Sequence, residues 1–144
     1  MSSKDYTELI DAFKRYEIFC RCMIDAYILI GLDGKIIKCN QLFSILVGKS
    51  QKFLVNDKLF SDIIKIYSGD LEITLEKILK NTVPTRIDEI RGETDKKKDL
   101  NFIMGLYPFI KDQKLIGMFL LLRDVTAETN LQGKYKVKAT QSIT

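Results

Sequence analysis

The sequence contains no histidine and no tryptophan, and it has only two prolines and three cysteines. Without histidine the chain cannot supply a phosphoacceptor histidine, an imidazole ligand for haem, or a histidine general base. Cys20 and Cys22 are too close in sequence to form an ordinary disulfide, and a Cys-x-Cys pair with the distant Cys39 is not the spacing of a structural zinc site. We therefore expect reduced thiols and no metal site.

The sequence also lacks a long apolar run and a block of charge of one sign. The apolar stretch 116–122 is far shorter than the ~20 residues of a membrane helix, and the acidic N-terminal segment is atypical of a signal peptide. The 23 basic and 19 acidic residues are intermixed, so no basic stripe follows a nucleic-acid backbone. The lysines at 96–98, 134, 136 and 138 are expected to be solvated. We expect a cytoplasmic protein without membrane insertion or nucleic-acid binding.

The length and composition are sufficient for one globular domain, since 46% of the 144 residues are hydrophobic. Residues 1–23 predict an amphipathic helix, with Asp5 as a cap and Glu8 three residues later. Its apolar stripe has alternating spacings of three and four, and it can pack on the domain's own sheet or on the same helix of a second subunit. The stripe consists of Tyr6, Leu9, Phe13, Tyr16, Cys20 and Met23.

A hairpin and a capped helix follow. The β-rich run 27–30 and the run 35–39 are separated by Asp33-Gly34, a strong hairpin signal. Asn40 is then placed to cap a helix through its side-chain oxygen, and Gly48 ends that helix. The helix carries Leu42, Phe43, Leu46 and Val47.

The middle of the chain predicts helices and the last third predicts strands. Short helical pieces are expected near 53–54 and 59–66, and an amphipathic helix is expected to open at 68–70 with Leu71, Leu75, Ile78 and Leu79 on one face. Pro84 closes this stretch. Three strands are predicted at 85–91, 100–110 and 115–123. Strands in two clusters around a helical block indicate an α+β fold with an antiparallel sheet.

The final strand is apolar on both faces. Ile116, Met118, Leu120 and Leu122 alternate with Leu115, Phe119 and Leu121, so both sides of this strand should be covered. The helical block can cover one side only. We expect the N-terminal helix to cover the other, because a bare apolar patch promotes association.

These features together resemble a PAS domain over residues 24–126. The residues that carry the resemblance are the Asp33-Gly34 turn, Asn40 and Gly48 around the first core helix, Gly117, and Arg123-Asp124-Val125-Thr126. The resemblance implies a five-stranded antiparallel sheet with short helices on one face that enclose a small cavity. The N-terminal helix would lie on the other face, and residues 127–144 would form a C-terminal linker or tail.

The resemblance also implies a ligand pocket. Ile37 and Cys39 are expected inward because they lie opposite Lys38 in strand parity. Further apolar candidates are Phe43, Leu46, Phe60, Phe102, Met104 and Phe119, and polar candidates are Arg86, Asn101 and Tyr107. The alternative is that the apolar side chains fill the core and that the three polar side chains lie at the surface, since arginine is rarely buried without a partner. A cysteine-adduct flavin is not expected, since the Asn-Cys-Arg-Phe-Leu-Gln string is missing, and there is no tryptophan for an aromatic flavin clamp. The sequence does not identify a cofactor.

The end of the domain carries a second expectation. Asp124 can accept hydrogen bonds from N–H groups of the following turn and suits the positive end of a helix dipole. In similar domains an Asp-x-Thr at this place couples the sheet to the departing helix, and Asp124 and Thr126 match it. The alternative is an ordinary cap with no signalling role.

Two classes of function follow, and a third shares the fold of the first. The first is a non-enzymatic sensory and dimerisation module that relays ligand or partner state through its terminal helices. It would form a homodimer through the N-terminal helix and outer sheet face, with a kinase or cyclase effector outside this chain. The second is a small enzyme with a conical pocket that uses Asp88 or Glu89 with Tyr107, although these acids lie beside Arg86 and Arg91 in a charged strand. The third is a scaffold without a ligand.

Overall fold

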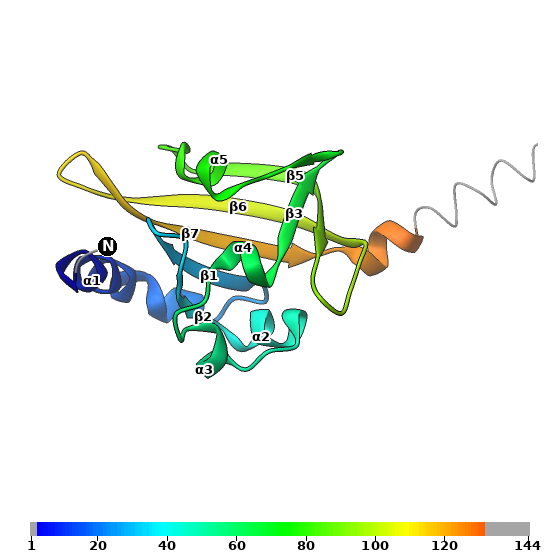
Figure 1. Cartoon of the computed structure of the whole chain (residues 1–144), viewed down its shortest axis with the longest axis horizontal. Helices are drawn as coiled ribbons and strands as arrows, with labels where there is room; N and C mark the ends of the chain where they lie inside the picture. Colours follow the sequence, from blue (N-terminus) through cyan, green and yellow to red (C-terminus); the bar gives the residue numbers. More distant parts are fainter. Residues whose placement is uncertain (1–2, 132–144) are drawn as a thin grey trace, which may run out of the picture.

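A seven-stranded antiparallel sheet forms the centre of the computed structural model, which describes residues 3–131 (Figure 1). The strand order is β2-β1-β7-β6-β5-β3-β4. The strands are β1 (Ala26–Gly31), β2 (Ile36–Cys39), β3 (Lys65–Ser68), β4 (Leu71–Glu72), β5 (Thr85–Glu93), β6 (Leu100–Lys111) and β7 (Lys114–Asp124). The predicted α+β class is confirmed. The five expected strands are present as β2-β1-β7-β6-β5, and β3 and β4 extend the sheet.

Helices lie before, between and after these strands. They are α1 (Ser3–Cys20), α2 (Gln41–Val47), α3 (Gln51–Leu54), α4 (Phe60–Ile63) and α5 (Leu75–Leu79). Residues 126–131 are also helical and project from the end of β7 (Figure 1). α1 is the only long helix in the described part of the chain, with 18 residues, whereas α2 to α5 have seven residues or fewer.

The β1–β2 hairpin and α2 form where the local sequence predicts them. Gly34 has a positive φ of 85° in the turn, and its N–H donates to the Gly31 carbonyl over 3.0 Å. Asn40 has extended backbone angles and caps α2 by accepting the Phe43 N–H, while Gly48 ends the helix in the left-handed conformation. The local turn and capping residues therefore determine where the hairpin turns and where α2 begins and ends.

The segment 59–79 differs from the prediction. The helix expected over 59–66 is limited to α4, and the one expected from 68–70 begins only at Leu75 as α5. Residues between them form the β3–β4 hairpin, with Gly69 at φ 62° in its turn. Ile66 is buried and pairs with Gly92 of β5, so sheet pairing overrides a helical pattern that was weak in this stretch. Leu71 is exposed on β4 instead of facing the core.

Two apolar clusters lie on opposite faces of the sheet. The inner cluster joins the sheet to α2, α3, α4 and α5, and includes Phe43, Leu54, Phe60 and Ile78. The outer cluster joins the sheet to α1. The prediction that helices cover one face and the N-terminal helix covers the other is confirmed.

Candidate functional site: the outer sheet face and the exit corner

The outer face holds α1 through a small aromatic cluster. Leu9 and Phe13 have no exposed surface, and Cys20 is buried with them against β1 and β7. The Phe13 ring lies 5.7 Å from that of Phe119 and 5.6 Å from that of Tyr27, in tilted arrangements that aromatic pairs favour. These contacts make α1 part of the folded domain.

Polar contacts fix both ends of α1. The Tyr6 phenol donates a hydrogen bond to the Asp33 carboxylate in the β1–β2 turn. This bond is the main cause of a raised Tyr6 pKa. Burial alone would raise the pKa of Asp33, but hydrogen bonds from Tyr6 and from the Lys35 N–H leave it lowered. Ion pairs of α1 with β6 and β2 join Glu8 to Lys111 (3.3 Å) and Glu17 to Lys38 (3.6 Å).

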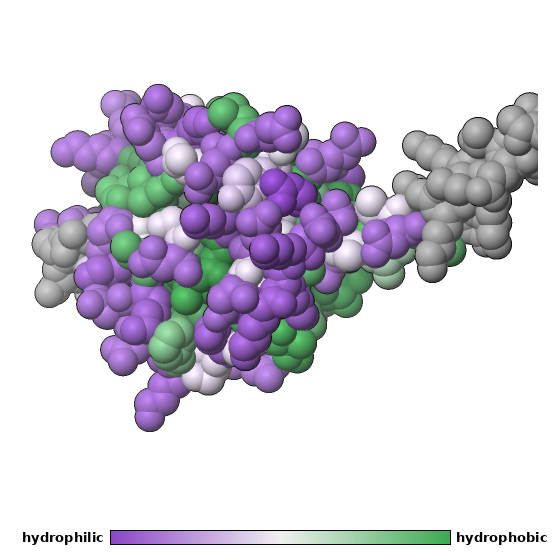
Figure 2. All heavy atoms as spheres, turned by 45° about the vertical axis from the view of Figure 1, so that its right-hand side comes forward, coloured by the Kyte–Doolittle hydropathy of each residue, from purple (hydrophilic) through white to green (hydrophobic). Residues whose placement is uncertain are grey.

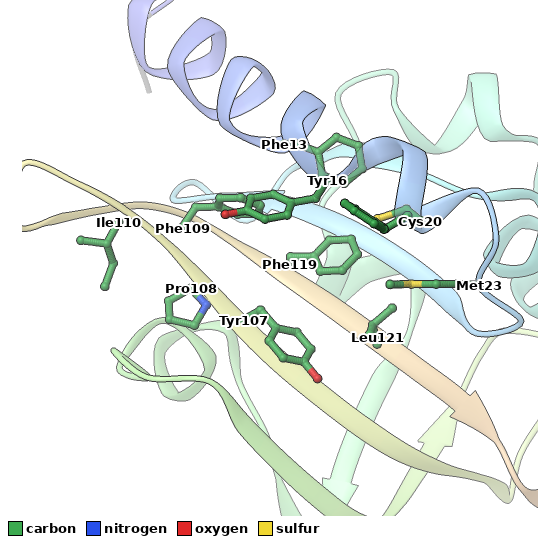
Figure 3. Close-up of a pocket in the computed structure, with 11 residues that line it drawn as sticks. Phe13, Tyr16, Cys20, Met23, Tyr107, Pro108, Phe109, Ile110, Phe119 and Leu121 are labelled. Atoms are coloured by element: carbon green, nitrogen blue, oxygen red, sulfur yellow. The ribbon is translucent and has the colours of Figure 1, made fainter.

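α1 covers β1 and β7 but leaves a groove of about 660 Å³ against β6 (Figure 3). Among the residues that the structure describes, no charged side chain lines this groove. Several of its aromatic side chains are exposed, with Phe19 at 67%, Tyr16 at 54% and Tyr107 at 39% of their surface. The lining residues are Phe13, Tyr16, Phe19, Cys20, Met23, Tyr107, Pro108, Phe109, Ile110, Phe119 and Leu121. The groove is a concave and almost wholly apolar surface.

The predicted stripe of α1 is divided between core and groove. Leu9, Phe13 and Cys20 are buried, Tyr6 is half-buried, and Tyr16 is exposed at the groove. Met23 lies beyond the end of the helix and still packs on the outer cluster. Phe19 was not in the predicted stripe. Its signal was the apolar pair at 18–19 beside that stripe, which widens the apolar face of the helix.

The predicted pocket residues separate onto the two faces of the sheet. One group is buried in the inner cluster, where the Phe43 and Phe60 rings stack with centroids 6.3 Å apart. This group consists of Cys39, Phe43, Leu46, Phe60, Phe102 and Met104. Their inward position agrees with the expectation, and whether they bind a ligand stays a prediction.

The other group lies on the outer face. The expectation that Ile37 and Phe119 face the cavity is therefore wrong, and the three polar candidates take the alternative surface position. On β6, Asn101 and Tyr107 have the opposite parity to the inward Phe102 and Met104. Arg86 pairs with Gly105, whose β7 partner Leu121 packs on the outer cluster, so Arg86 is also outward. The outward residues are Ile37, Arg86, Asn101, Tyr107 and Phe119.

Two β-bulges explain why three side chains lie on the opposite face of the sheet from the one that strand alternation predicts. In the β1–β2 pair the register passes from Leu29↔Lys38 to Ile30↔Ile36, so Ile37 is an extra residue and turns outward. In the β6–β7 pair Ile116 is the extra residue. Ile116 therefore joins the outer cluster and Leu115 packs on the inner one, the reverse of the predicted sides.

A smaller cleft opens on the inner side, between the α4–β3 segment and the β4–α5 segment. Its volume is about 350 Å³. Phe60, Ile64, Ile66 and Ile78 contribute buried apolar surface, and Phe60 is the predicted pocket residue that lines it. Polar side chains also line it: Ser61, Lys65, Glu72, Thr74 and Glu76.

The exit corner links the end of β7 to the start of β6. The Asp124 carboxylate accepts from the Thr126 N–H (3.0 Å) and from its hydroxyl (2.6 Å), as the sequence suggested for the N–H. The Thr126 hydroxyl oxygen also accepts from the Asn101 N–H (2.9 Å), and the Val125 N–H donates to the Asn101 carbonyl (2.8 Å). The first helical residue after β7 is thus tied to a neighbouring strand.

The two acids of the enzyme hypothesis, Asp88 and Glu89, do not lie in an apolar site. Asp88 and Glu89 are exposed on β5, and Asp88 forms an ion pair with Arg86 at 2.9 Å. Glu89 has a positive φ of 58° at a β-bulge between Ile87 and Ile90. Tyr107 lies in the outer groove. This geometry is that of a solvated strand rather than of a catalytic acid pair.

Hydrophilic side chains cover most of the face in Figure 2, and hydrophobic side chains form separate small patches on it. Among residues 3–131, no helix is both long enough and apolar enough to cross a membrane. Within the same residues, no group of three cysteine, aspartate or glutamate side chains is placed to hold a metal ion.

No protein-family model matches the sequence, and a search of curated proteins gives no match. Solved structures match the fold. A PAS domain from Colwellia psychrerythraea has a TM-score of 0.59 at 20% identity, and the match covers 79% of this chain and 96% of that chain. The PAS domain of the fruit-fly ELK potassium channel has a TM-score of 0.56 at 17% identity, with coverages of 76% and 95%.

A third match is a domain of the sensory box sensor histidine kinase/response regulator from Geobacter sulfurreducens, with a TM-score of 0.53 at 14% identity and coverages of 77% and 92%. These likenesses show that the fold is PAS-like, as the resemblance in the sequence predicted. A fold hosts many functions, so the function has to be argued from the sites.

Proposed function

We propose that this PAS-like chain is a non-enzymatic sensory and dimerisation module of a cytoplasmic signalling protein. The observation that carries the proposal is the aromatic groove between α1 and β6, which residues 3–131 of one copy leave open. A structural neighbour is described as part of a sensor histidine kinase, which supports a signalling context. The output, such as a kinase or cyclase, would lie outside this chain.

A second copy is the occupant that the groove favours. Its lining is uncharged and rich in tyrosine and phenylalanine, the composition of the buried centre of a protein interface. The exposed Phe19 and Tyr16 lie on α1, whereas Tyr107 and Ile110 lie on β6. In a two-fold dimer, the α1 aromatics of each copy would fill the groove above β6 of the other.

The terminal segments would carry the signal. α1 packs on the outer sheet face and the helix at 126–131 begins at the exit corner. A change in how two copies pack on that face would alter β6 and β7. Through the Asp124 and Thr126 contacts with Asn101, such a change would reach the departing helix.

The small-molecule part of the proposal belongs to the inner cleft rather than to the outward polar residues. Its volume of about 350 Å³ lies in the usual range for ligand sites, roughly 300–1,000 Å³, and it combines apolar walls with polar groups. A panel of small acids and cofactors should include one that raises the unfolding midpoint of the full chain, because a ligand of the folded state adds stability. Thr74→Trp should fill the cleft and suppress that shift. If no compound in the panel raises the unfolding midpoint, the proposal of a small-molecule ligand is wrong, and the proposal of a dimer is unaffected.

The dimer is tested by one charged substitution and a matched control. Phe19→Lys places an ammonium in the groove and should weaken self-association by at least about tenfold in sedimentation measurements. Leu71→Lys changes an equally exposed apolar side chain on β4, at the far edge of the sheet, and should leave association unchanged. A wild-type chain that sediments as a monomer at all concentrations, or equal effects of both variants, would overturn the dimer.

A further inference from the structure

An ion pair joins the segment before β1 to the end of β7, 98 residues apart in sequence. The Arg123 guanidinium donates through Nε to Asp25 Oδ1 (3.0 Å) and through Nη2 to Oδ2 (3.4 Å). The Arg123 side chain is 56% exposed, but that of Asp25 is only 16% exposed. This two-pronged geometry fixes the orientation of both side chains better than a single contact would.

Asn40 holds the Asp25 end of this pair. Its amide Nδ2 donates to the Asp25 carbonyl (2.9 Å), and its Oδ1 accepts from the Tyr27 N–H (3.0 Å). The same oxygen accepts from the Phe43 N–H (3.1 Å) and so caps α2. The position of α2 therefore determines where the Asp25 backbone lies.

The other end of the pair adjoins the exit corner. Arg123 immediately precedes Asp124, which fixes the Thr126 N–H at the start of the departing helix. A continuous series of contacts thus runs from the cap of α2 through Asp25 and Arg123 to that helix. Phe43, Leu46 and Val47 of α2 belong to the inner core, so this series connects the core to the exit.

We propose that the Asn40–Asp25–Arg123 contacts couple the position of α2 to the stability of the helix that begins at Thr126. This inference rests on the relay part of the proposed function, and it names the path by which a change in the inner core reaches the exit. The coupling needs neither a bound ligand nor a second copy.

A double-mutant cycle on the full chain, read by amide hydrogen exchange at residues 126–131, tests the coupling. Asn40→Ser keeps a cap acceptor for α2 but loses the amide donor to Asp25. Arg123→Gln removes the ion pair. Each change should speed exchange at 126–131 about two- to fivefold, and the double variant should do no more than the larger single effect, because both act on one path. Asp25→Asn should reproduce Arg123→Gln and also be non-additive with it.

Arg86→Gln is the matched control, because Arg86 forms a similar ion pair with Asp88 on β5 that has no contact with Asn40. It should leave exchange at 126–131 unchanged. Slow exchange at the buried Met104 and Leu106 verifies that each variant is folded. The coupling would be overturned if Asn40→Ser left exchange at 126–131 unchanged. It would also be overturned if the rate increase in the double variant were the product of the two single increases. Light scattering on the same samples reports dimer loss separately.

Discussion

At the scale of single residues, Asn40 joins the start of α2 to the segment 25–27, where β1 begins. It accepts from the Phe43 and Tyr27 N–H groups and donates to the Asp25 carbonyl. A simple cap such as the exposed Ser50, which precedes α3, accepts through its side chain from the Phe53 N–H. Replacing Asn40 therefore removes partners from β1 and from the segment before it, as well as from α2.

Asn40→Ala should lower the free energy of unfolding by about 1–3 kcal/mol, because a cap and two further hydrogen bonds are lost together. Ser50→Ala should cost about 1 kcal/mol or less, since one partly solvated bond is lost. Urea unfolding of both variants measures the difference. Equal losses would show that the contacts with Tyr27 and Asp25 add nothing.

The cysteines provide a residue-scale test of burial. Cys22 is exposed, whereas Cys20 and Cys39 are buried, and burial raises the pKa of Cys39 to about 11. Because the thiolate is the reactive form, iodoacetamide at pH 8 should modify Cys22 in the folded chain and spare the other two. Mass spectrometry of the labelled protein identifies the modified residues. Rapid modification of Cys39 without unfolding would contradict its place in the core.

The raised pKa of Cys39 also predicts a pH dependence. The folded state holds this proton more tightly than the unfolded state, whose pKa is near 9. The resulting stability is fully present below about pH 9 and is lost as the pH rises toward 11. Cys39→Ser should flatten this decline in urea unfolding measurements at several pH values, and Cys22→Ser should not. If Cys39→Ser lost stability with rising pH as steeply as the wild type, Cys39 would not be the source of this pH dependence.

At the scale of elements, the contact between α1 and β7 depends on a glycine. A Cβ at Gly117 would lie 2.5 Å from the Leu9 side chain and 2.9 Å from the Ile30 carbonyl oxygen, which is backbone and cannot move aside. For a Cβ at Gly105, on the same face, the three nearest atoms all belong to the partly exposed Tyr107 side chain. Substituting Gly117 therefore tests the packing of α1 on the sheet, and substituting Gly105 tests a change on the same sheet face that leaves α1 in place.

Gly117→Ala should destabilise the chain by about 1–3 kcal/mol and speed hydrogen exchange in α1, because α1 has to shift outward. Gly105→Ala should have a smaller effect and leave exchange in α1 unchanged, since Tyr107 can turn away. Thermal unfolding and amide exchange measure both. Equal exchange in α1 for the two variants would show that α1 does not pack against Gly117.

Elements with strong local signals were predictable from the sequence. The Asp33-Gly34 turn, the Asn40 cap and the Gly48 end are decided by backbone conformation and neighbouring donors, so they appear where expected. β3 and β4 were missed because Ile66 becomes a strand residue only through pairing with β5. Such a pairing joins residues far apart in sequence, and the local pattern does not contain it.

The candidate site was predictable only in part, for a related reason. Strand parity alone separates Asn101 and Tyr107 from Phe102 and Met104, so their outward position could have been found in the sequence. Ile37 could not, because a bulge against β1 reverses its side. The contacts of Asn40 with Asp25 and Tyr27 likewise depend on the folded arrangement of distant segments.

At the scale of the whole molecule, the described residues of one copy cover the outer sheet face incompletely. α1 shields β1 and β7 and leaves the aromatic groove over β6 open to solvent. A second copy would cover it and bring the two α1 helices close together. We propose that this groove is the interface of a homodimer.

The most direct measurement is the distance between the two copies, obtained by pulsed electron paramagnetic resonance with a nitroxide on Cys22. Cys22 is exposed two residues beyond α1 and lies between Cys20 and Met23, which line the groove, so its label flanks the proposed interface. A homodimer through the groove should give one narrow distance distribution that disappears in Phe19→Lys. A folded, labelled wild-type chain without dipolar coupling, or with the same distribution in Phe19→Lys, would contradict it.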